Sequence, residues 1–322
     1  MIKILLISVA TLVLSLSLAS GGVLNATSEE YMSGEIYFLQ GKWQKAIRAY
    51  EALDSIEVEE LLRLSDAYIY LENYKSAKET LESTLKVKDN PDFRVSLAML
   101  KAIEKKKYLK ELDKLFKLYS DNPRLWRSAG IAYMKHGFDE KALSYFNVAV
   151  EKDPTDYMSY FFIGNLFEIH YAFDDAIEAY KKSLKINPDF AQALNNLGYN
   201  YKERHYYTYA IQTYKRAIEV DPDNAGYYYN IGNAYSHKDM TEEAYASYRK
   251  ALELEPTFAK AHYNMGRTYL RMNMLKEALD EFKLYVKYWD PSIPSQDAPH
   301  PESFKEEIKL LEEALMEQTR EK

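Results

Sequence analysis

Apolar and aromatic residues recur at helical spacing in pairs of short stretches along most of the chain. Between Ala225 and Phe258, the stretches "GYYYNIGNAYSHK" and "EEAYASYRKALEL" are each long enough for one helix, and the polar tripeptide "DMT" separates them. Pro256 ends the second stretch, because proline cannot continue a helix. The pattern therefore predicts a pair of helices joined by a tight turn.

Several residue types recur along the chain at one fixed interval, the interval that separates Gly198 from Gly232. Each glycine is followed by an aromatic residue, then by an alanine and a second aromatic residue. The glycines are Gly130, Gly164, Gly198, Gly232 and Gly266, and the second aromatics are Phe146, Tyr180, Tyr214, Tyr248 and Phe282. A glycine inside a helix costs roughly 0.5–1 kcal/mol relative to alanine. Five in register predict that a bulky residue of the partner helix packs directly against the backbone.

This pattern resembles the tetratricopeptide repeat (TPR), a helix–turn–helix unit of about 34 residues. The resemblance is closest at "WRSAGIAY", "LNNLGYNY" and "YNIGNAY", which begin at Trp126, Leu194 and Tyr229. It covers residues 123–290 as five well-matched repeats and residues 27–122 as degenerate N-terminal repeats. The resemblance implies an all-α fold, a right-handed α-solenoid of about eight repeats.

The two ends of the chain differ from the repeats. Residues 1–21 contain Lys3, an apolar run and then small residues, which is the layout of a secretory signal peptide. The alternative is an uncleaved segment that tethers the protein to a membrane. Residues 291–302 form a proline-rich linker, and residues 303–322 are predicted as a C-terminal capping helix. Its apolar face would cover the last repeat or, alternatively, fold back into the groove or onto a partner.

Composition narrows the compartment and the class of partner. The chain of 322 residues has no cysteine, which excludes a lipid-anchored lipoprotein and a disulfide framework. With the N-terminal segment, this favours export to the periplasm or cell envelope of a bacterium. The net charge is −7 and no long Lys/Arg block occurs, so we expect no nucleic acid partner.

We find no arrangement of residues typical of an enzyme. The motifs HExxH and GxSxG and a Gly-rich phosphate loop are absent from the sequence. His136 and His170 occupy equivalent places in successive repeats, but no third ligand recurs beside them, so we interpret them as solvent-facing helix ends. We therefore expect no catalytic residue, no metal and no cofactor.

The resemblance implies that the first helix of each repeat lines a concave surface that binds a protein or peptide. Under that assignment, the candidate binding residues are Phe161, Asn165, Asn195, Asn196, Tyr199, Tyr229, Asn230, Asn233, Lys260, Tyr263, Asn264, Arg267 and Arg271. Side-chain amides both donate and accept hydrogen bonds, so a row of them can hold the backbone of an extended peptide. The alternative is that these asparagines simply reflect the family consensus.

Charge at the candidate surface suggests one further feature. Some TPR proteins hold a C-terminal carboxylate in a clamp of lysine, arginine and two asparagines. Asn165 and Asn196 match the asparagines, but Phe161 and Asn230 stand in the basic places, which argues against such a clamp. Lys260, Arg267 and Arg271 instead predict a positive patch on the last repeat, where an acidic segment or the chain's own acidic tail would dock.

These inferences favour a non-enzymatic protein–protein interaction scaffold that assembles a cell-envelope complex, such as a secretion system or a periplasmic motor collar. Two alternatives remain open. The chain could be an accessory subunit that presents a client to a transporter or an outer-membrane assembly complex. It could also be the substrate-recruiting module of a separate enzyme. Association of copies of the chain into a homo-oligomer is left open as well.

Overall fold

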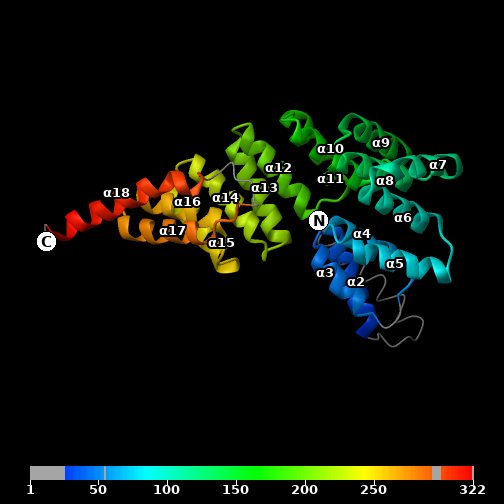
Figure 1. The fold of residues 1–322 in the computed structure, drawn as a ribbon, viewed down its shortest axis with the longest axis horizontal. Coiled ribbons are helices and arrows are strands. Elements are labelled where there is room, and N and C mark those ends of the chain that lie inside the picture. The colour runs from blue at the N-terminus through cyan, green and yellow to red at the C-terminus, as the bar shows by residue number, and fades with distance from the viewer. Residues whose placement is uncertain (1–25, 54–55, 292–298, 321–322) are drawn as a thin grey trace. The chain divides into compact units, whose positions relative to one another are not determined.

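A computed structural model describes residues 26–53, 56–291 and 299–320, and every regular element within these ranges is helical. The helices form two compact units, of which the first ends at Lys152 and the second begins at Asp153 (Figure 1). The predicted signal peptide or anchor, residues 1–21, lies outside the described residues. Among the helices described, none is both long and apolar enough to span a membrane.

In the first unit, consecutive helices pack in pairs. The pairs are α2 (Ala26–Leu39) with α3 (Trp43–Glu51), α4 (Val58–Tyr70) with α5 (Tyr74–Val87), α6 (Pro91–Glu104) with the 3-10 helix η1 (Lys106–Tyr108) and α7 (Leu109–Tyr119), and α8 (Pro123–Lys135) with α9 (Asp139–Lys152). The segment from Pro91 to Asn122 is thus a helix pair although its repeat pattern is weak.

The second unit continues the same arrangement. Its pairs are α10 (Tyr157–Ile169) with α11 (Phe173–Ile186), α12 (Ala191–Glu203) with α13 (Tyr207–Val220), α14 (Ala225–His237) with α15 (Thr241–Leu254), and α16 (Ala259–Arg271) with α17 (Leu275–Tyr288). Together with the four pairs of the first unit, these pairs confirm an all-α array of about eight helix–turn–helix repeats.

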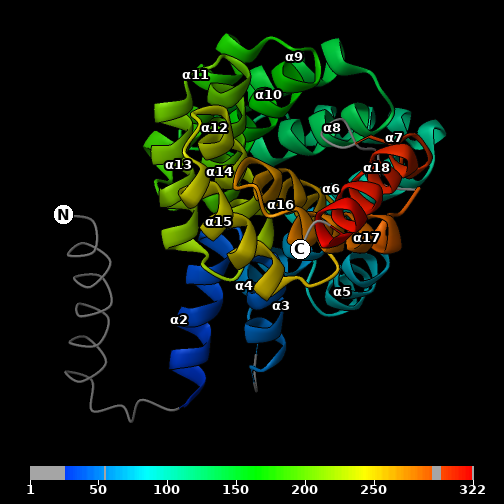
Figure 2. The ribbon, with the colours of Figure 1, turned by 90° about the vertical axis from the view of Figure 1, so that its left-hand side faces the viewer.

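The C-terminal helix α18 (Pro301–Arg320) lies against α17 (Figures 1 and 2). It begins two residues before the predicted start at residue 303, at a proline, which is well tolerated in the first turn of a helix. Phe304 is only 2% exposed and packs edge-on against Phe282 and Tyr263. The helix therefore covers the apolar end of the last repeat.

The helical glycines make room for a ring from the second helix of the same repeat. A Cβ atom added to Gly130 would lie 2.5 Å from the Phe146 ring, and one added to Gly232 would lie 2.6 Å from the Tyr248 ring. Such distances are shorter than van der Waals contact. The remaining pairs of this kind are Gly34 with Tyr50, Gly164 with Tyr180, Gly198 with Tyr214, and Gly266 with Phe282. The predicted close approach is confirmed, and the ring responsible is the second aromatic of each repeat.

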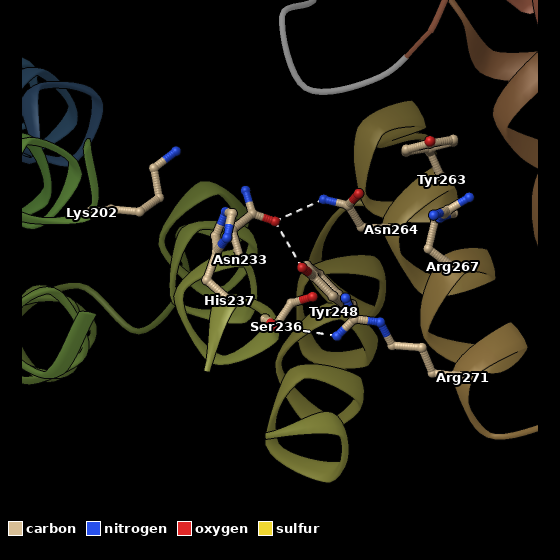
Figure 3. A pocket seen from close by; sticks show the side chains of 9 residues that line it. All are labelled: Lys202, Asn233, Ser236, His237, Tyr248, Tyr263, Asn264, Arg267 and Arg271. Atoms are coloured by element: carbon tan, nitrogen blue, oxygen red, sulfur yellow. Dashed lines mark hydrogen bonds between the residues drawn. The ribbon is translucent and has the colours of Figure 1, made fainter. Parts of the chain in front are cut away.

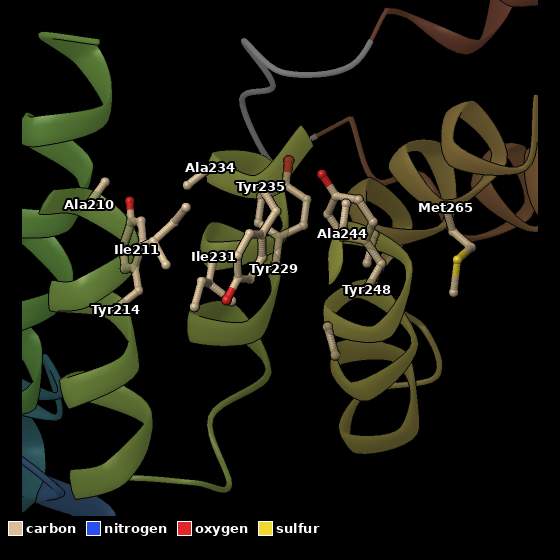
Figure 4. Close-up of a cluster of buried hydrophobic side chains, with 12 residues drawn as sticks. Ala210, Ile211, Tyr214, Tyr229, Ile231, Ala234, Tyr235, Ala244, Tyr248 and Met265 are labelled. Atoms are coloured by element: carbon tan, nitrogen blue, oxygen red, sulfur yellow. The ribbon is translucent and has the colours of Figure 1, made fainter. Parts of the chain in front are cut away.

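The repeat of α4 and α5 solves the same packing problem with other residues. Ser65 stands where the other repeats have glycine, and Leu81 stands where they have a ring; both are fully buried. Ser65 is larger than the glycine of the other repeats, and Leu81 is smaller than their ring, so the two changes offset each other. Between repeats, alanines and isoleucines fill the space beside the rings, as Figure 4 shows for Ile211, Tyr214 and Tyr248.

Each turn between paired helices in the second unit contains a residue with positive φ. These residues are Tyr171, His205, Asp239 and Asn273, with φ between 57° and 60°. A bulky side chain is strained in this left-handed conformation. Tyr171 is also 70% exposed, so little packing offsets its strain.

We predict that Gly130→Ser destabilises the protein by about 2 kcal/mol through overpacking against Phe146. Adding Phe146→Leu should recover part of this loss, because the pair then copies Ser65 and Leu81. Urea unfolding of both single variants and the double variant measures the coupling. Additive effects of the two substitutions would contradict the proposed packing.

We predict that Tyr171→Gly raises the free energy of unfolding by about 0.5–1 kcal/mol, because glycine adopts positive φ without strain. Tyr206→Gly is the matched control, since Tyr206 is also an exposed turn tyrosine but has a φ of −85°. The control should lose stability in thermal unfolding. If both variants lose stability equally, strain at Tyr171 is not the cause.

Candidate functional site

All thirteen candidate residues lie on the first helices of the second unit. Phe161 and Asn165 belong to α10; Asn195, Asn196 and Tyr199 to α12; Tyr229, Asn230 and Asn233 to α14; and Lys260, Tyr263, Asn264, Arg267 and Arg271 to α16. The structure places them on the same kind of helix, as the resemblance implies. Their role in binding stays a prediction.

The asparagines next to the glycines bond to the packed tyrosines. Tyr180 Oη donates to Asn165 Oδ1 at 2.7 Å, and Asn196 Nδ2 of the following repeat donates to the same oxygen at 3.1 Å. One end of the Asn165 amide therefore joins both the second helix of its own repeat and the first helix of the next repeat.

The same arrangement recurs two repeats later. Tyr248 Oη donates to Asn233 Oδ1 at 2.8 Å, and Asn264 Nδ2 donates to that oxygen at 2.7 Å (Figure 3). Asn233 is itself buried. These asparagines thus have a structural task, which is to satisfy a buried hydroxyl and link neighbouring repeats.

The other candidates divide into packed and accessible side chains. Phe161 and Tyr229 are buried, with Phe161 packing against Phe190 and Tyr229 against Phe258. Asn230 Nδ2 donates to Asn195 Oδ1 at 2.8 Å, which is another link between repeats. Tyr199 is half-buried on α12. The most accessible candidates are the arginines at the end of α16.

The residue after each glycine matches the chemistry of the ring. Where the ring is a tyrosine, this residue can be an acceptor, as with Asn165, Asn233 and Glu35, which accepts from Tyr50 Oη at 2.7 Å. Where the ring is a phenylalanine, no hydroxyl requires an acceptor. Repeats of that kind have Ile131 and Arg267 at this position. Arg267 is therefore not needed for the packing of its own repeat.

A cavity of about 220 Å³ opens on the first helices near the C-terminal end of α16 (Figure 3). Its lining comes from α12, α14, α15 and α16 and consists of Lys202, Asn233, Ser236, His237, Tyr248, Tyr263, Asn264, Arg267 and Arg271. Three of these residues are lysine or arginine and none is acidic. The cavity is therefore electropositive in a chain whose net charge is −7.

The pKa of His237 reflects the positive charges around this cavity. Partial burial lowers the pKa of His237 below its ordinary value, and the charges of Lys202, His205 and Arg271 lower it further. Arg271 is held in place because its Nη1 donates to the Ser236 carbonyl at 3.1 Å, near the end of α14. The cavity thus presents positioned donors to a ligand.

A second cavity, of about 390 Å³, lies at the N-terminal ends of α14 and α16. Tyr229, Asn230 and Lys260 line it, together with Gly226 and the aromatic residues Phe258, Tyr285, Tyr288 and Trp289. The structure therefore separates Lys260 from Arg267 and Arg271, which the sequence grouped in one patch. An Asn264 Nδ2–Tyr229 Oη contact of 3.4 Å joins the linings of the two cavities.

Sequence reasoning did not identify Lys202 and His237 in the first cavity or Trp289 in the second. These residues do not recur from repeat to repeat, so the periodic pattern gives no indication of them. The His136 interpretation also needs correction, because His136 is half-buried and its Nε2 lies 2.7 Å from the Ala102 carbonyl. Within the described ranges, no three His, Asp or Glu side chains are grouped so that they could hold a metal ion.

Glu168 on α10 accepts hydrogen bonds from Tyr180 and Asn200 at the interface between two repeats. Burial raises the pKa of Glu168 above its ordinary value, although these hydrogen bonds oppose the shift. A raised folded-state pKa means that the protonated form is favoured on folding. Glu168 therefore stabilises the fold at acidic pH, and this contribution is lost as the pH rises through the folded-state pKa.

We predict that Glu168→Gln raises the melting temperature at pH 7, because a neutral amide removes the cost of the buried carboxylate while it still accepts hydrogen bonds. The difference in melting temperature between the variant and the wild type should shrink as the pH falls below the ordinary pKa of a glutamate. Glu178→Gln is the control, since Glu178 is exposed on the neighbouring helix. A pH-independent difference would show that desolvation is not the cause.

Comparison with known proteins identifies the repeats. Models described as "TPR repeat" match residues 172–204 and 200–239, and models described as "Tetratricopeptide repeat" match residues 225–258, 247–280, 30–55 and 61–91. The matched segments lie in both units and together cover just over half of the chain.

Individual relatives are more distant. BBSome complex member BBS4 from Bos taurus is 26% identical over 154 residues, which are 45% of this chain but only 29% of that protein. A solved structure of MamA is 22% identical, with a TM-score of 0.50, over 56% of this chain and 100% of that chain. The structure of YrrB, a TPR protein with an unusual peptide-binding site, is 19% identical, with a TM-score of 0.49, over 55% of this chain and 91% of that chain. At these identities the MamA likeness shows the fold alone. From the repeat matches in both units, we conclude that the chain belongs to the tetratricopeptide repeat family.

Proposed function

We propose that this protein is a non-enzymatic scaffold that holds an extended segment of a partner protein on the first helices α12, α14 and α16, within a complex of the bacterial cell envelope. TPR repeats support a role in protein–protein interaction and indicate protein or peptide partners.

One observation carries the proposed surface. The first cavity is lined almost entirely by first-helix side chains, and the second is lined by first-helix residues together with residues of α17 and the adjoining loops. An Asn264–Tyr229 contact joins the two linings. A segment that crosses both would meet amide and arginine donors at one end and aromatic side chains at the other. Aromatic residues and arginine are enriched at the centres of protein interfaces.

The envelope location is supported by the sequence of residues 1–21. A single lysine, an apolar run and small residues favour export, and either cleavage or retention of this segment would leave the repeats outside the cytoplasm. The proposed complex is therefore one in which the repeats meet other exported proteins.

We predict that Gly226→Leu abolishes capture of a partner by crosslinking in the native envelope, because the leucine would fill the second cavity. A Cβ atom at Gly226 meets only Asn224 Oδ1, at 3.1 Å, and leucine favours helix, so the fold should persist. Ala246→Leu, on an exposed position of α15, is the matched control.

A protein crosslinked by wild type and by Ala246→Leu but lost in Gly226→Leu would support the proposed surface. If Gly226→Leu captures the same protein to the same extent, binding does not involve this cavity. Thermal unfolding of each variant verifies that the repeats remain folded.

A further inference from the structure

We propose that the cavity lined by Lys202, Arg267 and Arg271 binds one carboxylate side chain of the partner segment. This inference rests on the proposed function, because it specifies the chemistry of the segment held on the first helices. It predicts that the segment has an Asp or Glu at a fixed position. It also predicts that the chain's own C-terminal helix competes with the segment for that site.

The charge of the cavity selects an anion. Its lining contains three permanent cations and no carboxylate. Each cation pairs with one carboxylate that is not part of the lining, namely Glu203, Asp239 and Glu307. The lining also offers a neutral hydroxyl donor from Tyr263. A carboxylate placed here would accept charge-assisted hydrogen bonds, which are about twice as strong as neutral ones.

The size of the cavity suits a small group at the end of a side chain. A volume of about 220 Å³ leaves room for such a group together with ordered water. That space suits the end of an Asp or Glu side chain and the water around it. The rest of the segment would lie along the first helices toward the second cavity.

The repeat register shows that this cation is particular to the last repeat. At the position of Arg267, other repeats have Glu35, Ile131, Asn165, Tyr199 and Asn233. Packing does not require a basic residue here, since Phe282 has no hydroxyl for it to meet. The Arg267 guanidinium is therefore not used within its own repeat and is 54% exposed, whereas the amides at equivalent positions are engaged with tyrosines.

A carboxylate of the same chain already approaches this cation. Glu307 of α18 lies 3.4 Å from Arg267 Nη1, and the two side chains are 39% and 54% exposed. Ion pairs between exposed side chains contribute little to stability, so an incoming carboxylate can displace this one. Phe304 holds α18 against the last repeat independently of this pair. Glu307 thus shows that the arginine accepts a carboxylate and would weaken binding of the partner.

The test uses the full chain and a labelled, end-blocked Gly/Ser peptide with a central Glu-Glu pair. The matched probes have Gln-Gln or phosphoserine in the centre, and fluorescence anisotropy measures their affinities at low salt. We expect the Glu peptide to bind about tenfold more tightly than the Gln peptide, and Arg267→Gln to remove most of this difference. Lys215→Gln, an exposed change on α13, should have no effect.

Two further readouts separate the cavity from general attraction between charges. Glu307→Gln should strengthen binding of the Glu peptide about 2- to 5-fold, because the internal competitor is lost. The pKa of His237, followed by NMR, should rise when the peptide binds, because a nearby carboxylate favours the charged imidazole. Both changes should be absent in Arg267→Gln.

The proposal is overturned if the Glu and Gln peptides bind equally, or if Arg267→Gln behaves like Lys215→Gln. Binding of the phosphoserine peptide without binding of the Glu peptide would also overturn it and would assign the site to phosphate. If the carboxylate proposal fails while Gly226→Leu still abolishes partner capture, the interaction surface stands and only its assigned ligand is wrong.

Discussion

The packing of a side-chain ring against a bare helical backbone is the contact on which the repeats of this protein depend. A helical glycine costs roughly 0.5–1 kcal/mol, whereas burial of an aromatic side chain contributes about 1.5–3 kcal/mol. Burial of the ring therefore contributes more than the helical glycine costs in every repeat that has both. At Gly130 and Gly164, an added Cβ atom would lie 2.5 Å from the ring. The two helices of these repeats can therefore lie this close only because the residue is glycine. Where serine replaces glycine, at Ser65, leucine replaces the ring.

The chemistry of the ring then decides which polar side chains remain available. A buried tyrosine hydroxyl needs an acceptor, and in two repeats an asparagine of the first helix supplies it while also receiving an amide from the next repeat. The polar row on the first helices is therefore partly a structural network. A phenylalanine ring makes no such demand, and in the last repeat this leaves Arg267 accessible.

The last repeat differs from the others in both its cavity and its neighbour. The helix α18 covers its apolar end through Phe304, which keeps Phe282 and Tyr285 of that end buried. The same helix brings Glu307 to Arg267 across a solvent-exposed pair. Structural capping and the chemistry of the proposed anion site are thus linked through one helix.

The sequence alone determined most of the helix pairs and the residues that pack between them, because these features depend on local periodicity and recur in most repeats. It also identified the apolar face of the C-terminal helix. Only the tertiary structure decided which polar residues are engaged, since the Asn165–Asn196 and Asn233–Asn264 bonds join different repeats. The cavities likewise depend on residues outside the repeating pattern. Lys202 and Trp289 have no counterparts in register, so their meeting with the candidate residues follows from the packing of helices rather than from the order of residues along the chain.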